Sequence, residues 1–132
     1  MNNIIALDVG ESRIGVAIAN SVARLPSPLM TLQNSETVWE EIRAVAEQQS
    51  ANVIVVGLPR NLSGQDTEQT RYVRNFVQSG GEGLQIEFQD EALTSKKAEQ
   101  ELNLRGKPFT KGDIDALAAT YILQDYLDQH GA

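Results

Sequence analysis

The stretch IIALDVGESRIGVAIA, residues 4–19, decides the fold. Residues 3–9 form an apolar run without alternation, which is typical of a strand buried on both faces. A second such run covers residues 13–20, and the Gly10-Glu11-Ser12 turn between the two predicts a hairpin. Asp8 stands near the end of the first run, where an ionised carboxylate is costly unless a positive group meets it. The stretch therefore predicts a core hairpin with a carboxylate that needs a cationic partner.

After this hairpin the chain alternates helices with strands. We expect a short strand at 29–33, a helix at 38–49, a buried strand at 52–59 ended by Gly57 and Pro59, a helix at 67–79, a strand at 84–89, a short helix from Thr94 or Ser95 to about Gly106, and a final helix from about 113 to 129. A β-meander followed by such alternation predicts an α/β domain, with a mixed sheet covered by helices. No linker or repeat divides residues 1–132, so we expect one domain.

Helix starts and helix faces can also be predicted. Thr37, with Glu40 three residues later, has the pattern of a capping box. Asp66 is placed to cap helix 67–79, and Asp113 to cap the final helix. Helical spacing predicts one inward stripe on the final helix, made of Ile114, Leu117, Ala118, Tyr121 and Ile122.

The charge of the chain bears on its partners. A formal net charge of −7 argues against a generic binder of phosphate backbones, which is usually basic. Eight of the eleven Lys and Arg residues nevertheless lie between Arg60 and Lys111. Five of them are Lys96, Lys97, Arg105, Lys107 and Lys111, which form either a local basic patch or a solvated helix face.

The composition also restricts the chemistry. Cysteine is absent and the single histidine, His130, is near the C-terminus, so a metal site would be built from oxygen ligands. No apolar run reaches the roughly 18 residues of a membrane span. Together with the lack of cysteine, this favours a cytoplasmic protein.

Carboxylates stand at the ends of three expected elements. Asp8 ends the first strand, Asp90 and Glu91 end the last strand, and Asp113 and Asp115 open the last helix. If they meet at one edge of the sheet, they repel one another unless a cation lies between them. A hard divalent ion such as Mg²⁺ or Mn²⁺ suits an all-oxygen set, and two such ions can promote phosphodiester hydrolysis.

The pattern ranks these acids only in part. Helical spacing puts Asp115 at the border of the apolar face and Asp113 on the opposite flank, so we prefer Asp115 for a site beside the sheet. Strand parity groups Asp90 with Leu84, Ile86 and Phe88, and groups Glu91 with the polar face, which does not decide between the two. For Asp8 the alternative is a simple turn-forming role with Gly10.

Four blocks of the sequence resemble one known family. LDVGESRIGVAIA (7–19), VVGLPRNLSGQ (55–65), DEALTSKKAEQEL (90–102) and DIDALAATYIL (113–123) occur in this order and span nearly the whole chain. They resemble the YqgF/RuvX family of ribonuclease H-like proteins, described as pre-16S rRNA nucleases or Holliday junction resolvases. The resemblance implies a ribonuclease H-like fold, with a central mixed sheet of five strands flanked by helices.

The same resemblance implies a set of site residues. The catalytic and metal-binding residues would be Asp8, Glu91 and Asp115, with Mg²⁺ or Mn²⁺ as the cofactor. The residues expected to contact substrate phosphates are Arg13, Arg60, Asn61 and Lys96, with Ser63 beside them. The alternatives are an ordinary surface loop for residues 60–65 and a pair with Glu11 for Arg13. Family members usually have basic residues where this chain has Ser12 and Ala92, so two phosphate contacts are expected to be missing.

The implied function is that of a metal-dependent nuclease on structured RNA, in 5′-end processing of pre-16S rRNA. A Holliday junction resolvase acting on four-way DNA is the alternative; it should be a two-fold dimer with an extended basic face, which a net charge of −7 does not favour. A non-catalytic nucleic-acid-binding module would not need mutually repelling acids. A fragment of an actin-like or sugar-kinase ATPase would need two such domains. The sequence leaves monomer and homodimer open.

Overall fold

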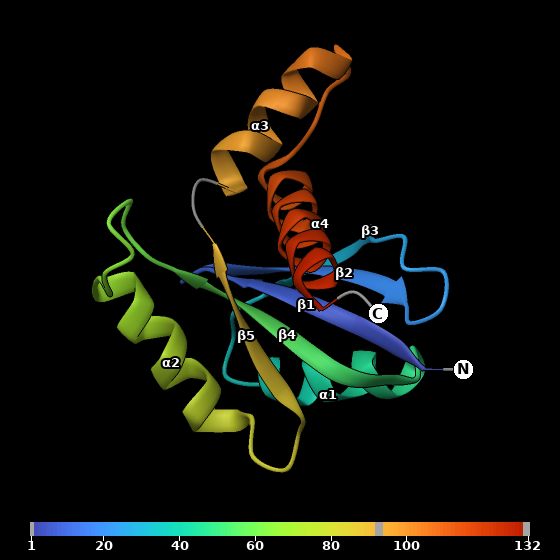
Figure 1. The fold of residues 1–132 in the computed structure, drawn as a ribbon, viewed down its shortest axis with the longest axis vertical. Coiled ribbons are helices and arrows are strands. Elements are labelled where there is room, and N and C mark those ends of the chain that lie inside the picture. Colours follow the sequence, from blue (N-terminus) through green and yellow to red (C-terminus); the bar gives the residue numbers. More distant parts are fainter. Residues whose placement is uncertain (1, 92–93, 131–132) are drawn as a thin grey trace.

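The computed structural model describes residues 2–91 and 94–130 (Figure 1). Its elements are, in chain order, β1 (Asn3–Val9), β2 (Arg13–Asn20), β3 (Ser27–Gln33), α1 (Val38–Gln48), β4 (Ala51–Pro59), α2 (Glu68–Gly80), β5 (Ile86–Glu91), α3 (Thr94–Arg105) and α4 (Lys111–Gln129). Ala92, one of the two positions where a basic residue is usual, lies outside the described residues. Within these residues, no helix combines the length and the apolar character that crossing a membrane requires.

The strands form one sheet in the order β3-β2-β1-β4-β5. The pairs β1–β2 and β2–β3 are antiparallel, whereas β1–β4 and β4–β5 are parallel. This confirms the mixed sheet and the first hairpin, whose turn is closed by the amide of Gly10 donating to the carbonyl of Arg13 at 2.9 Å. Because β1, β4 and β5 run the same way, their C-terminal ends lie at one edge of the sheet, where open α/β sheets gather ligands.

Helices cover both faces of the sheet. Helices α1 and α2 pack on one face and α4 on the other (Figure 1). Ile5 and Leu7 of β1 point to α1 and α2, while Ile4 and Ala6 point to α4. Strand alternation therefore places Asp8 on the α4 side.

Helix α4 is buried on two sides, not along one stripe. Its sheet-facing residues are Ala119, Ile122, Leu123, Tyr126 and Leu127. A second cluster joins Leu117 and Ala118 to Ala98 and Leu102 of α3, which stands beyond the sheet in Figure 1. The predicted inward residues do lie in or against these clusters, but four of them face α3 and only Ile122 faces the sheet. The prediction was therefore incomplete, because helical periodicity does not separate two adjoining buried faces.

Two strands differ from the predicted ranges. Strand β3 begins two residues early, at Ser27, and β5 runs over 86–91 because its pairing with β4 extends to Pro59 and Glu91. Gly57 does not end β4, which continues through it to Pro59. The predicted alternation holds at Leu84 and Ile86, which pack against the core, but it is reversed further along: Phe88 is 40% exposed, whereas Gln89 is only 4% exposed. Helix α4 packs on the Gln89 side, while the Phe88 ring is covered by the guanidinium of Arg74, 5.9 Å from the ring centroid.

The predicted caps of α1 and α2 need correction. Thr37 is the N-cap of α1, but its side chain makes no capping hydrogen bond, so the capping box with Glu40 does not form. Thr67, not Asp66, caps α2 in a capping box with Thr70. Asp66 instead pairs with Arg60 and Arg74, whose Nε atoms lie 3.3 Å and 3.5 Å from its carboxylate oxygens.

The start of α4 also differs from the predicted one. The helix begins at Lys111, two residues before the expected start at about 113. Its N-cap is Thr110, not Asp113, and Asp113 is the N3 partner of a capping box. The Thr110 amide donates to Asp113 Oδ2 at 2.8 Å, and the Asp113 amide donates to Thr110 Oγ1 at 3.1 Å. Asp113 therefore helps to start the helix, as expected, but from inside its first turn.

Candidate active site

Asp8 lies at the C-terminal end of β1, flanked by two glycines on neighbouring strands. It pairs with Gly15 across the hairpin. On the other side, the last paired residues of β1 and β4 are Leu7 and Val56. Asp8 and Gly57 each follow one of these residues, so they lie next to each other. The half-buried Asp8 side chain therefore has space on both sides along the sheet.

Gly15 allows α4 to lie directly on β2. A Cβ at this position would be 2.0 Å from the carbonyl oxygen of Asp115, which is shorter than any tolerable contact. The absence of a side chain therefore brings the backbone of Asp115 onto the strand that pairs with Asp8. This contact fixes the position of the third acid relative to the first.

Gly57 makes the corresponding space for Glu91. A Cβ at Gly57 would be 3.0 Å from Glu91 Oε1 and 2.5 Å from Ile122 Cδ1. The carboxylate of Glu91, from edge strand β5, therefore lies over β4 on the α4 side. This orientation agrees with strand parity, which places Glu91 and Gln89 on the face that α4 covers.

The electrostatics of Asp8 show that the three acids are close. Burial raises the pKa of Asp8 well above its usual value of 3.8, and repulsion from Glu91 and then from Asp115 raises it further. Asp90 is exposed and faces Arg60, with 3.5 Å between Oδ2 and Nη1. Of the other four candidate acids, Glu91 and Asp115 are therefore the two whose charges act on Asp8.

Arg13 supplies a positive charge at this cluster. Its Nε donates to Asp115 Oδ2 at 2.6 Å, and the two side chains are 34% and 17% exposed. A charge-assisted hydrogen bond of this length is strong. The predicted alternative partner, Glu11, is not the residue that Arg13 meets.

The donor set can be tested for a metal ion. Carboxylate oxygens at partly buried positions, whose charges repel one another, are the ligands that Mg²⁺ and Mn²⁺ prefer. In the described part of the chain, however, no three or more Asp, Glu, His or Cys side chains already converge closely enough to hold one ion. The guanidinium of Arg13 occupies Oδ2 of Asp115. The chemistry of the residues therefore fits a divalent ion, which would compete with Arg13 for Asp115.

The predicted substrate-contacting residues lie in two places. Arg60 and Asn61 line a shallow cavity of about 260 Å³ together with Leu62, Gly64, Asp90 and Glu91. Arg60 lies 3.3 Å from Asp66 and 3.5 Å from Asp90, so acids already surround part of its charge. Oδ1 of Asn61 accepts the amides of Ser63 and Gln65 and so stabilises its own loop. Lys96 is exposed on the first turn of α3.

The roles of Gly15 and Gly57 in positioning the acids were not predicted from the sequence. A signal was present, because a glycine inside a strand often marks the close approach of another backbone. The pattern could not say which segment approaches, since Asp115 is one hundred residues from Gly15 in sequence.

Comparison with known proteins assigns the family. The family described as RuvX, Holliday junction resolvase, matches residues 2–129. The chain belongs to the RuvX family. Two curated relatives are both named "Putative pre-16S rRNA nuclease". The one from Sulfurihydrogenibium sp. is 38% identical and the alignment covers 98% of this chain and 92% of that protein. The one from Chloroflexus aurantiacus is 43% identical and the alignment covers 95% of this chain and 86% of that protein.

Solved structures confirm the fold of this RuvX chain. T. thermophilus RuvC in complex with a Holliday junction substrate aligns with a TM-score of 0.55 and 15% identity, covering 100% of this chain and 98% of that one. The Fowlpox virus resolvase in complex with Holliday junction DNA aligns with a TM-score of 0.52 and 11% identity, covering 98% and 99%. These similarities confirm the ribonuclease H-like arrangement of the sheet and helices.

The raised pKa of Asp8 predicts how the stability of this RuvX chain depends on pH. A carboxyl whose pKa is raised by folding binds more protons in the folded state, so its contribution to stability falls as the pH rises above the usual value of 3.8. Without metal, we expect Asp8→Asn to be more stable than wild type at neutral pH, with the difference shrinking as the pH falls toward 3.8. Urea unfolding of both proteins in EDTA from pH 4 to pH 8 measures this difference. A difference that does not change with pH would contradict it.

Proposed function

We propose that this chain is a metal-dependent nuclease that hydrolyses phosphodiester bonds in structured RNA, with 5′-end processing of pre-16S rRNA as its reaction. The observation that carries the proposal is the grouping of Asp8, Glu91 and Asp115 at the edge of the sheet where parallel strands end. The names of the curated relatives support the RNA substrate. We place the reaction in the cytoplasm, which the cysteine-free sequence favours, and in a single domain of residues 1–132.

In this proposal the three carboxylates would hold Mg²⁺ or Mn²⁺. The bound ion would activate a water molecule and stabilise the leaving oxygen of the phosphodiester. The chain itself positions the ligands: Gly15 and Gly57 admit Asp115 and Glu91 to the space beside Asp8. Arg13 holds Asp115 in place and balances its charge in the absence of the ion.

The substrate would lie along the cavity beside Glu91. Arg60 and Asn61 line that cavity and could contact the phosphates next to the one that is cleaved. Arg60 is restrained by Asp66 and Asp90, which would orient its guanidinium while lowering its net attraction for phosphate. Arg13 and Lys96 remain in the proposal as further phosphate contacts.

A Holliday junction resolvase is the second candidate, because the family carries that description and two structural neighbours were solved with junction DNA. The same three acids would serve both reactions. The net charge of −7 favours the RNA substrate, since junction binding calls for an extended basic face.

Cleavage of two labelled substrates tests the proposal. A precursor rRNA 5′-end fragment and a four-way DNA junction would each be incubated with the wild type in Mn²⁺, Mg²⁺ or EDTA. We expect cutting of the RNA fragment that requires the metal. Metal-dependent cutting of the junction alone would replace the proposal with the resolvase function, and no cutting of either substrate by folded protein would contradict nuclease activity.

The Arg13–Asp115 pair gives a second test, which measures metal binding rather than activity. Arg13→Gln should destabilise the metal-free protein by about 1 kcal/mol, since the pair is partly buried and its loss leaves Asp115 among other acids. Mn²⁺ should replace the missing positive charge, so the rise in Tm on adding Mn²⁺ should be larger in Arg13→Gln than in wild type. An equal or smaller rise would contradict competition between Arg13 and the ion.

A further inference from the structure

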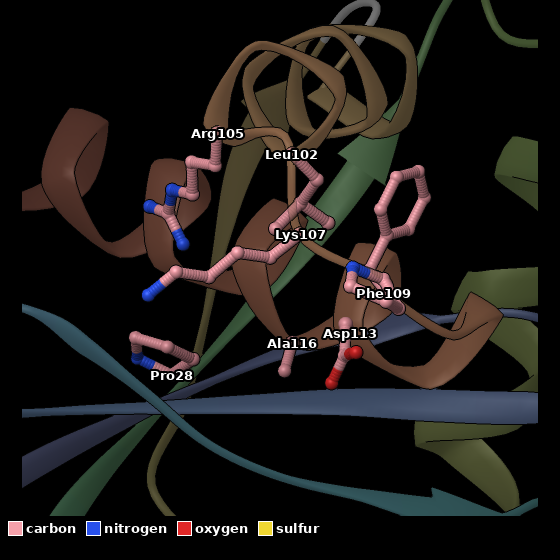
Figure 2. A pocket seen from close by; sticks show the side chains of 8 residues that line it. Pro28, Leu102, Arg105, Lys107, Phe109, Asp113 and Ala116 are labelled. Carbon is pink, nitrogen blue, oxygen red and sulfur yellow. The ribbon is translucent and has the colours of Figure 1, made fainter.

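A second concave surface lies on the other flank of α4, between the end of α3 and β3. Its cavity of about 260 Å³ has an apolar wall that includes Pro28, Leu102 and Phe109, with Ala116 at its base (Figure 2). An adjoining cavity of about 300 Å³ continues it along β3 and shares Pro28 and Ala116. We call this surface the α3–β3 groove.

Two cations stand at one end of the α3–β3 groove. Figure 2 shows that Arg105 and Lys107 extend toward the same side, above Pro28. Arg105 pairs with Glu101, whose carboxylate lies 2.5 Å away on the exposed surface of α3. Asp113 lines the groove away from these cations, where its Oδ2 accepts the amide of Thr110.

The groove also lies in the most basic segment of an acidic chain. Residues 94–111 hold five basic and two acidic residues, whereas the net charge of the chain is −7. Helix α3 projects beyond the sheet and so presents this segment to solvent (Figure 1). A partner that approaches this segment meets positive charge. This favours binding of a polyanion over binding of a neutral or apolar partner.

Only one turn of α4 separates the groove from the candidate active site. Asp113 and Ala116 line the groove, while Asp115, between them in sequence, turns its carboxylate to Arg13. A helix with its side chains is about 10–12 Å wide, so a few nucleotides of an extended strand would cover the distance between the two flanks.

We propose that the α3–β3 groove binds a segment of the nucleic-acid substrate that flanks the cleaved bond. Arg105 and Lys107 bind its backbone phosphates, and the wall formed by Leu102, Phe109 and Pro28 receives a base or a sugar. The pairing of cations with an apolar wall matches the mixed chemistry of a single-stranded nucleotide. The inference rests on the proposed nuclease function and adds to it a second contact region.

Binding of a fluorescently labelled single-stranded RNA tests the groove. Anisotropy would be measured over a range of salt concentrations, with Asp8→Asn in every protein so that the RNA stays uncut. The double variant Arg105→Ala/Lys107→Ala should weaken binding about tenfold and lower the slope of log Kd against log salt by about 1, as expected for losing one to two phosphate contacts. Arg71→Ala, an exposed arginine on α2 across the sheet from α4, is the matched control and should bind like the parent.

The outcomes separate this inference from the proposed function. Both groove residues are exposed, so circular dichroism is expected to show unchanged folding of the double variant. If the double variant binds like Arg71→Ala, or if the parent does not bind RNA, the groove proposal is overturned, whatever the wild type does in the cleavage assay. If the wild type cuts neither substrate, nuclease activity fails, and weaker binding by the double variant alone would still support a nucleic-acid groove.

Discussion

Asp8→Asn should lower metal-dependent cleavage by more than about 100-fold, because loss of residues that merely support a metal ligand already costs about 10–100-fold. Asp8 is the acid that the other two surround: its pKa is raised by burial and by both Glu91 and Asp115. Replacing its charge removes the group that a divalent ion would share with its neighbours. The rate of RNA cleavage in Mn²⁺ at equal protein concentration measures the effect.

The matched control for this variant is Asp113→Asn. Asp113 is two residues from Asp115 on the same helix, but its carboxylate serves the capping box with Thr110. An amide oxygen can still accept the Thr110 hydrogen bond, and Asp113 lines the α3–β3 groove away from the residues proposed to bind the substrate. We therefore expect cleavage close to wild type. Wild-type cleavage by Asp8→Asn, or an equal loss in both variants, would contradict the assigned role of Asp8.

Gly15→Ala should disturb both the fold and the site. The new Cβ would lie 2.0 Å from the carbonyl oxygen of Asp115, and this atom belongs to a helix backbone that cannot simply rotate away. Helix α4 must therefore move off β2, and we expect a loss of about 1–3 kcal/mol in unfolding free energy, the usual cost of overpacking a core. The same displacement moves Asp115 away from Asp8, so cleavage should fall as well.

Gly112→Ala is the control on the same helix. A Cβ at Gly112 would have ordinary contacts, the nearest at 3.4 Å from Thr31 Oγ1. We expect it to leave cleavage unchanged and to alter stability by up to about 1 kcal/mol in the favourable direction, since alanine is the better helix former. Urea unfolding measures the change in unfolding free energy of each of the two variants. Equal stability of Gly15→Ala and wild type would show that α4 does not depend on the missing side chain.

Local patterns in the sequence were sufficient to predict much of the fold. The apolar runs on either side of Gly10 predicted the hairpin, and the alternation of later elements predicted the mixed sheet, because burial and period are properties of neighbouring residues. Helical spacing preferred Asp115 to Asp113, and the structure does place Asp115 beside the sheet. The choice of Glu91 over Asp90 came from family resemblance, since parity alone left it open.

The remaining features depend on which segments meet in three dimensions. The exposure of Phe88 and the burial of Gln89 follow from where α4 crosses the edge strand, which the alternation along β5 does not reveal. Arg13 meets Asp115 across 102 positions of sequence, and no local pattern distinguishes this partner from Glu11. The same holds for the two glycines beside Asp8, whose purpose is visible only once α4 and β5 are in place.

Titration of Mn²⁺ into the protein tests the central claim most directly, that Asp8, Glu91 and Asp115 together hold a divalent ion. Isothermal titration calorimetry would compare wild type with Asp8→Asn, Glu91→Gln and Asp115→Asn, with Asp113→Asn as the control. We predict that wild type and Asp113→Asn bind Mn²⁺ alike, and that each of the other three variants weakens binding by more than about 10-fold. Binding that is unchanged in those three variants, or weakened equally in Asp113→Asn, would contradict the account.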